Sequence, residues 1–351
     1  MLGLGNSLTS ASYVGVFSQK YSLDFDGSND YVDVGAAYNG VKSISFFLKV
    51  DDVTSNTDYI LGLNDTDYVS VVDGTVTLNG FSGGTNTIYV DASEASTVDT
   101  SWHHILITST TARNASNCDL GRTQSNNSYN MLGNLDEVAL TSDVKSASDF
   151  ADGTTPLDIS GLSNLQNWWR MGDGKLDSYS LICDEVTPTL GSDVAVNGDL
   201  SSNPFAHATN YSGGWSDTSI GSSEATWSSG NQTISCVGDD SGSNRGNATA
   251  RVTAVSGKVY KVTFTNSTTP VNAALRISNV NSWASGTYLN VTPSSSQEFY
   301  FRSGVSGYVY ITFSVFDTTT WTFGNLKVEL VNGNAGIMTN MASGDIVEDT
   351  P

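Results

Sequence analysis

Short stretches of alternating apolar and polar residues, separated by turn residues, run along most of the chain. Between residues 44 and 50 the apolar side chains of Ile44, Phe46, Leu48 and Val50 fall on one face of an extended strand. The same pattern, bounded by Gly, Asn, Asp or Ser, predicts further strands at 59–63, 67–72, 75–79, 87–91, 103–109 and 135–141. This spacing is typical of a β-sandwich.

A second alternating region begins at Val194. It predicts strands at 232–237, 247–253, 259–265, 273–277, 298–302, 308–316 and 321–331. In one of these strands Tyr308, Tyr310 and Thr312 share a face. The intervening stretch around 185–195 contains proline, glycine and serine and predicts a linker. We therefore expect two all-β domains, each a jelly-roll sandwich.

The two ends of the chain lack strand alternation. The first 18 residues are rich in Gly and Ser yet carry apolar residues such as Leu2 and Leu4, which need a surface to cover them. We expect both ends to be extended arms that dock on neighbouring subunits of an assembly. The predicted division is an arm at 1–18, a sandwich at 19–190, a second sandwich at 191–331 and an arm at 332–351.

Composition narrows the classes of partner. The formal net charge of −21 makes nucleic acid an unfavourable partner, because the surface repels phosphate. A run of about 18 apolar residues is absent, so we expect no membrane insertion, and residues 1–19 contain no Lys or Arg, so we expect no signal peptide. Three widely separated cysteines predict no disulfide framework.

The first half carries three motifs of one family in order. These are SLDFDGSNDYVDVG at 22–35, SWHHI at 101–105 and GNLDEV at 133–138, and together they resemble laminin-G-like, concanavalin-A-like domains. The resemblance implies a calcium ion held by Asp26, Asn29 and Asp136, whose oxygens suit that cation. The alternative is that Asp26 and Asn29 stabilise a tight turn and that Asp136 caps a strand end.

Two features of this half bear on catalysis. His103 and His104 are adjacent on a strand, which predicts opposite faces and a structural role for the buried one. Asp136 and Glu137 are predicted to face opposite sides for the same reason, so the pair of nearby carboxylates that a glycoside hydrolase needs is not expected. We therefore expect no enzymatic activity.

The second half resembles jelly-roll carbohydrate-binding modules, that is, a galactose-binding-type sandwich. The motifs are VNGDL at 196–200, Gly214-Trp215, VYKVTFTN at 259–266 and WTFGNLKVELV at 321–331. In this family the turn containing Asp199 binds structural calcium together with a carboxylate near the last strand, a position that Asn325 occupies here.

Aromatic residues of this half are candidates for stacking on sugar rings, and an arginine is a candidate for bonding sugar hydroxyls. For each tryptophan the alternative is packing in the core. The predicted carbohydrate-binding residues are Trp215, Trp227, Trp283, Tyr288 and Arg276.

Three short flanking motifs resemble virion structural proteins of marine bacteriophages: MLGLGNSLTSA, NWWRMGDG and TNMASGDIVEDTP. The resemblance implies a tail-fibre, spike or capsid-decoration protein on the virion surface, assembled in the host cytoplasm and released by lysis. It also implies other virion proteins and host-surface glycans as partners, and a homo-oligomer, by analogy a trimer. The alternatives are a glycoside hydrolase or lyase subunit and a purely architectural virion protein.

Overall fold

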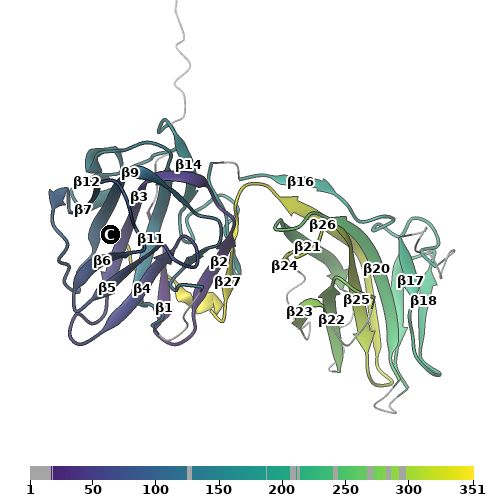
Figure 1. Ribbon diagram of the computed structural model, residues 1–351. Coiled ribbons are helices and arrows are strands. Elements are labelled where there is room, and N and C mark those ends of the chain that lie inside the picture. The colour runs from purple at the N-terminus through teal and green to yellow at the C-terminus, as the bar shows by residue number, and fades with distance from the viewer. Residues whose placement is uncertain are drawn as a thin grey trace, which may run out of the picture.

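The chain folds into two β-sandwiches joined at one end (Figure 1). The computed structural model describes residues 17, 19–124, 129–186, 188–205, 211, 214–239, 244–266, 272–281, 286–291 and 298–351. Within these ranges the helical segments are two 3-10 turns, Ala147–Asp149 and Ser343–Asp345. Neither is a candidate to cross a membrane. The expected all-β class is confirmed.

In the described part of the chain, the first sandwich packs a sheet of eight strands against a sheet of seven. Their apolar faces form one core, in which Phe46 and Leu48 are almost completely buried. The larger sheet contains β1 (Ser22–Asp26), β3 (Asn39–Val50), β7 (Asn86–Val90), β8 (Ser93–Glu94), β9 (His103–Asn114), β11 (Leu132–Thr141), β14 (Leu165–Trp169) and β28 (Ile346–Val347). The smaller sheet contains β2 (Tyr31–Gly35), β4 (Thr57–Gly62), β5 (Tyr68–Val72), β6 (Thr75–Asn79), β10 (Cys118–Leu120), β15 (Leu181–Ile182) and β27 (Gly336–Thr339).

The outer face of the larger sheet is also covered. The segment around the hairpin of β12 (Ala151–Asp152) and β13 (Thr155–Pro156) packs on it, and Phe150, Ile159 and Trp168 form a second small apolar cluster there. Both faces are therefore buried along β11 and along residues 104–109 of β9.

The second sandwich packs a six-stranded sheet against a five-stranded sheet, counting the described strands. The six-stranded sheet contains β16 (Leu190–Asp193), β18 (Glu224–Ser228), β19 (Thr233–Val237), β21 (Val259–Asn266), β24 (Glu298–Arg302) and β26 (Thr320–Val331). The five-stranded sheet runs in the order β17 (Trp215–Asp217), β20 (Gly246–Ala254), β25 (Gly307–Val315), β22 (Ala273–Ser278) and β23 (Thr287–Val291).

The end of the chain returns to the first sandwich, and the expected extended arm at 332–351 is wrong (Figure 1). After β26, strand β27 inserts between β15 and β2, where Val32 pairs with Met338. Strand β28 then pairs with β1. Strand β27 is only four residues long, too short for a sequence pattern to predict it, and it forms because β15 and β2 pair with it on both sides. Of the expected arm at 1–18, the described part is Phe17, whose ring stacks 6.3 Å from that of Trp168.

A compact junction connects the two sandwiches. The chain enters the second sandwich through β16 and leaves it through β26, and these two strands are paired. Arg302 at the end of β24 donates to the backbone oxygens of Asp33 (2.7 Å) and Ala335 (3.0 Å). Leu181, Tyr300 and Val331 belong to a buried apolar cluster at the same place. The junction therefore has both polar and apolar contacts.

Ending the chain after Val331 is expected to unfold the first sandwich and to spare the second. The loss of β27 leaves the backbone groups of β2 and β15 without partners and uncovers the core. Hydrogen exchange followed by mass spectrometry checks this: protection of β2 falls to the level of an unfolded chain, while protection of β20 stays. A chain ending after Ala342 keeps β27 and is the matched control; equal protection of β2 in both truncations contradicts the expectation.

Candidate functional site

The outer face of the five-stranded sheet carries a row of polar and aromatic side chains. In β25, Val309 and Ile311 point into the core, and Tyr308, Tyr310 and Thr312 alternate with them on the outer face. The face-sharing of these three residues is visible in the sequence. The row is therefore a direct result of strand periodicity.

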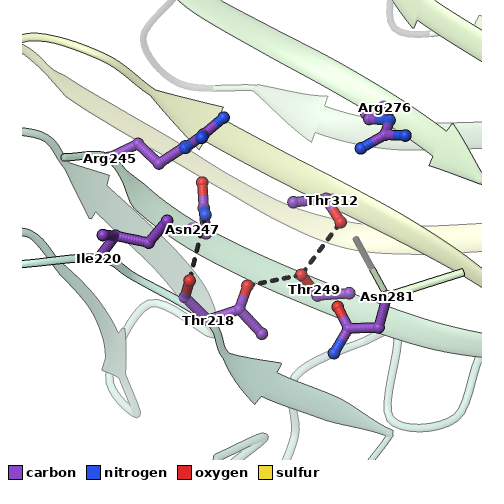
Figure 2. A pocket seen from close by; sticks show the side chains of 8 residues that line it. All are labelled: Thr218, Ile220, Arg245, Asn247, Thr249, Arg276, Asn281 and Thr312. Atoms are coloured by element: carbon purple, nitrogen blue, oxygen red, sulfur yellow. Dashed lines mark hydrogen bonds between the residues drawn. The ribbon is translucent and has the colours of Figure 1, made fainter. Parts of the chain in front are cut away.

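A small pocket opens on this face, with a cavity of about 140 Å³ (Figure 2). Three hydroxyl groups form a chain across it, one from the residue after β17 and two from β20 and β25: Thr218 Oγ1 lies 2.8 Å from Thr249 Oγ1, which lies 3.0 Å from Thr312 Oγ1. The described residues that line the pocket are Thr218, Ile220, Arg245, Asn247, Thr249, Arg276, Asn281 and Thr312.

Two arginines give the pocket a positive character. Arg276 is buried, with 3% of its surface exposed, and its Nε and Nη2 donate to Thr287 Oγ1 at 2.9 and 2.6 Å. Burial lowers the pKa of Arg276, and the charge of Arg245 lowers it further. None of the eight described lining residues is acidic. The pocket thus offers cationic and neutral hydrogen-bond donors.

An aromatic strip continues from the pocket along β25. Tyr308 is 51% exposed, and the guanidinium carbon of Arg251 lies 4.1 Å from the centre of its ring. The same arginine lies 5.1 Å from the ring of Tyr211, which meets Tyr310 edge to face at 5.6 Å. Successive outward residues of a strand are about 7 Å apart, so the strip begins beside Thr312 in the pocket.

The sequence-predicted sugar-binding residues fall in different places. Arg276 is in the pocket. Trp215 is completely buried and packs against Phe313 and Phe323, so its assignment as a sugar platform is wrong. The ring fills the space that Ala250, its partner on β20, leaves open.

The other aromatic candidates are not at the pocket. Trp227 is partly buried against the core of the second sandwich, and its Nε1 donates to Leu200 O. Tyr288 stacks on Phe301 and lines a separate cavity of about 610 Å³ at the domain junction. Trp283 lies outside the described residues. Sequence reasoning missed Arg245, Asn247 and Thr249, for which the alternating polar positions of β20 were the available signal.

The predicted calcium ligands of the first sandwich are not brought together. Asp26 pairs with Leu132, four residues before Asp136 on β11, which is about 13 Å of strand. Asp26 Oδ1 accepts the backbone N–H of Ser28 at 2.8 Å and so stabilises the turn. Asp136 is buried below the outer face of the sheet. The three-residue calcium site is therefore wrong, and the turn role of Asp26 is the one observed.

The turn of the second sandwich does reach the last strand. Leu326 N donates to Gly198 O at 2.9 Å, and a Cβ on Gly198 would lie 2.0 Å from Leu326 O, so the close approach requires glycine. This places Asp199 and Asn325 beside the contact. Asp199 Oδ1 accepts from the N–H of Ser201 at 3.2 Å. No cluster of three or more His, Cys, Asp or Glu side chains suited to a metal occurs among the described residues.

The expected opposite orientation of Asp136 and Glu137 is wrong, because a β-bulge lies between them. Leu135 and Val138 both point into the core, and Glu137 has a φ of 48° where the register shifts before Ala139. The bulge adds one residue to β11, so both carboxylates face the outer side. Strict alternation does not predict such an insertion.

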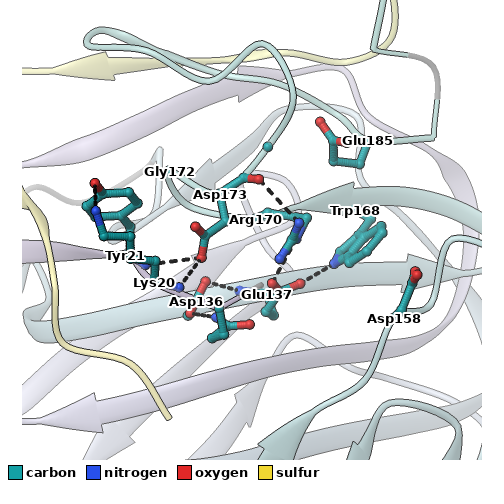
Figure 3. Close-up of polar contacts among 12 residues, drawn as sticks. Lys20, Tyr21, Asp136, Glu137, Asp158, Trp168, Arg170, Gly172, Asp173 and Glu185 are labelled. Carbon is teal, nitrogen blue, oxygen red and sulfur yellow. Dashed lines mark hydrogen bonds and ion pairs between the residues drawn. The ribbon is translucent and has the colours of Figure 1, made fainter. Parts of the chain in front are cut away.

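The carboxylate pair lies in a closed polar cluster (Figure 3). Glu137 accepts from Trp168 Nε1 and, at 3.0 Å, from Arg170 Nε, while Gln19 donates to Asp136. Burial raises the pKa of Glu137 to about 7 and that of Asp136 well above its usual range. Both carboxyl groups are buried and bonded, which suits a structural role in holding β14 and the residues before β1.

His103 and His104 also have structural roles in the first sandwich. His104 is buried, lies 4.9 Å from the ring of Phe47 and shares a hydrogen bond of 2.9 Å with Ser45. Burial lowers the pKa of His104 to about 4, so the ring is neutral at pH 7. His103 bonds Asp91 at 2.7 Å.

Comparison with known proteins gives distant likenesses. No protein-family model and no curated protein matches the chain. Among solved structures, the tailspike protein 4 enzymatically active domain of bacteriophage CBA120 is similar over 40% of this chain and 21% of its own length, with 15% identity and a TM-score of 0.28.

Two carbohydrate-binding modules are similar over 39% of this chain. A family 61 module in complex with β-1,4-galactotriose is matched over 98% of its length, with 14% identity and a TM-score of 0.28. A family 4 module is matched over 99% of its length, with 18% identity and a TM-score of 0.26. All these TM-scores are low, and none of the likenesses assigns a function to this chain.

The first sandwich is expected to lose stability as the pH rises from about 4 to about 7. Burial raises the pKa of Asp58, Asp119 and Asp177 to about 6 and that of Glu137 to about 7. Protons bound more tightly by the folded state stabilise it below the unfolded pKa, and this stabilisation is lost as the pH rises through the folded pKa.

Urea unfolding at pH 5 and pH 7.5 measures this pH dependence. Asp58→Asn keeps an oxygen to accept the Leu132 N–H and is expected to reduce the difference by roughly 1 kcal/mol, because about one unit of the raised Asp58 pKa lies between these two pH values. Asp65→Asn, at an exposed position, is the control and is expected to leave the difference unchanged. An Asp58→Asn protein with the full difference would contradict the assignment.

Proposed function

We propose that this protein binds glycans through the outer face of the five-stranded sheet of its second sandwich. The observation that carries the proposal is the continuity of two features on that face. A pocket of hydroxyl, amide and guanidinium groups adjoins the strip formed by Tyr211, Tyr308, Tyr310 and Arg251. Sugars present hydroxyls at their edges and C–H groups on their faces, and this surface has partners for both.

The geometry of the sheet supports a chain-like ligand over a compact one. Thr312, Tyr310 and Tyr308 are successive residues on the outer face of β25. A ligand that fills the pocket at Thr312 and extends along this strand therefore passes Tyr310 and then reaches Tyr308. The hydroxyl chain from Thr218 to Thr312 is already hydrogen-bonded, which fixes the orientation of the donors before a ligand arrives.

The proposed activity is binding without catalysis. The pair of carboxylates that shares a face, Asp136 and Glu137, is buried in the other sandwich, and its bonds to Trp168 and Arg170 support a structural role. Release of reducing ends from polysaccharide by the pure protein, abolished in Glu137→Gln, would contradict this part and favour a glycoside hydrolase.

We further propose a location on the virion surface, with other virion proteins and host-surface glycans as partners and a trimer as the assembly. The support is the sequence resemblance of the flanking motifs to virion structural proteins. Antibody labelling of purified particles tests the location, and light scattering of the purified protein tests the trimer.

Calcium at the turn of Asp199 and Asn325 stays part of the proposal. Calcium that binds only the folded state raises the melting temperature. The wild-type protein is compared with Asp199→Ala in calcium and in chelator; an equal melting temperature of the wild type in both solutions removes calcium from the proposal.

Replacing Tyr308 with alanine is expected to weaken glycan binding by roughly three- to tenfold, because the stacking surface next to Arg251 is lost. Binding is measured on a glycan array and then by calorimetry with the best oligosaccharide. Tyr129→Ala removes a tyrosine of similar exposure from the first sandwich and is expected to have no effect. Equal affinities of the two variants would place the binding surface elsewhere.

A further inference from the structure

We infer that the pocket beside Thr312 recognises a negatively charged substituent, a carboxylate or a sulfate, on an acidic glycan. The inference rests on the proposed glycan-binding function and specifies the class of sugar that this face selects. It is carried by the charges, the hydrogen-bonding groups and the size of the pocket.

The first observation is the charge of the pocket. The chain carries 36 Asp and Glu residues against 15 Lys and Arg residues, yet two of those arginines, Arg245 and Arg276, line this one small cavity. Its described lining includes no carboxylate. In a protein of net charge −21, such a pocket is a local exception that favours an anion.

The position of Arg276 strengthens the argument. Its guanidinium is buried at the pocket and held by two N–H groups on Thr287 Oγ1. The guanidinium is thereby held in one orientation with its charge at the wall of the pocket, which favours a carboxylate or a sulfate over a neutral group. Arg245 is near enough to lower the pKa of Arg276, so the two cations act on the same space.

The second observation points to a sugar and away from a free inorganic anion. Asn247 is 6% exposed, and its Oδ1 has no hydrogen-bond partner among the described residues, while its Nδ2 donates to Thr218 O at 3.1 Å. Figure 2 shows this amide between Thr218 and Arg245. A buried acceptor without a partner is costly, and a fully ionised anion has no donor to offer it, whereas a sugar hydroxyl does.

The size of the pocket limits what enters it. A cavity of about 150 Å³ holds one benzene ring, so the cavity of about 140 Å³ is large enough for one charged substituent with part of its ring. The rest of the glycan then lies outside, along Tyr310 and Tyr308. The pocket therefore selects the charged group, and the strip supports the neighbouring sugars.

A glycan array that presents each oligosaccharide backbone in neutral, uronic acid and sulfate-ester form tests the inference. Short oligosaccharides are used, because a long polyanion is repelled by the acidic surface of the whole protein. The proteins compared are the wild type, Arg245→Gln and Arg251→Gln. Arg251 is the matched control, because it lies on the same face and carries the same charge but is outside the pocket. Thermal unfolding verifies that each variant is folded.

We expect the wild type to bind the acidic forms and to bind their neutral counterparts about tenfold more weakly. Whichever of the uronic acid and sulfate-ester forms binds more tightly identifies the preferred anion. Arg245→Gln is expected to remove about tenfold of the preference, the effect of one charged hydrogen bond. Arg251→Gln is expected to weaken both forms equally and to keep the preference.

Three other outcomes overturn the inference in different ways. If the wild type binds neutral and acidic forms equally well and Arg245→Gln leaves the ratio of the two affinities unchanged, the anion specificity is wrong and the glycan-binding function stands. If no glycan of any class binds the wild type, the proposed function itself fails. A preference that disappears in Arg251→Gln and persists in Arg245→Gln would move the anion from the pocket to the aromatic strip.

Discussion

The pairing of β27 with both β2 and β15 is the constraint on which the rest of the molecule depends. It makes the first sandwich from two separated parts of the chain and leaves the second sandwich as an insertion between them. Closing a loop of this length costs entropy that grows only slowly with the number of residues, so the large insertion is tolerated. The paired strands β16 and β26 lower the cost further, because they hold the entry and exit of the insertion side by side.

This arrangement also determines where a ligand site is available. The outer face of the larger sheet in the first sandwich is covered by the segment around Phe150 and by Trp168. One edge of the second sandwich meets the junction, where Arg302 bonds the backbone of Asp33 and Ala335. The five-stranded sheet is the other layer of the second sandwich. On its outer face the polar positions of β20 and β25 carry hydroxyl, amide and guanidinium groups.

The five-stranded sheet has aromatic side chains on both of its faces, and small residues on the inner face make room for a buried tryptophan. Ala248 and Ala250 of β20 leave room that the indole of Trp215 fills, in contact with the rings of Phe313 and Phe323. Burying a large aromatic side chain of this kind stabilises the fold by about 1.5–3 kcal/mol. The tyrosines two residues apart on β25 have the opposite orientation and remain on the surface.

The sequence by itself determined the elements whose pattern is local. The alternation of 44–50, 259–265 and 308–316 predicted strands within a few residues of those observed, because side chains alternate between the two faces of any strand. The turn at Asp26 and the all-β class followed from the same local rules.

Tertiary structure alone decided the features that depend on partners distant in sequence. The strand Gly336–Thr339 is too short for its pattern to predict it and forms because β2 and β15 offer backbone groups on both sides. Glu137 lies on the same face as Asp136 because a β-bulge in β11 shifts its register with β3 by one residue. Arg245, Asn247 and Arg276 became one pocket because antiparallel pairing brings β20, β25 and β22 together, and no spacing along a single chain encodes that contact.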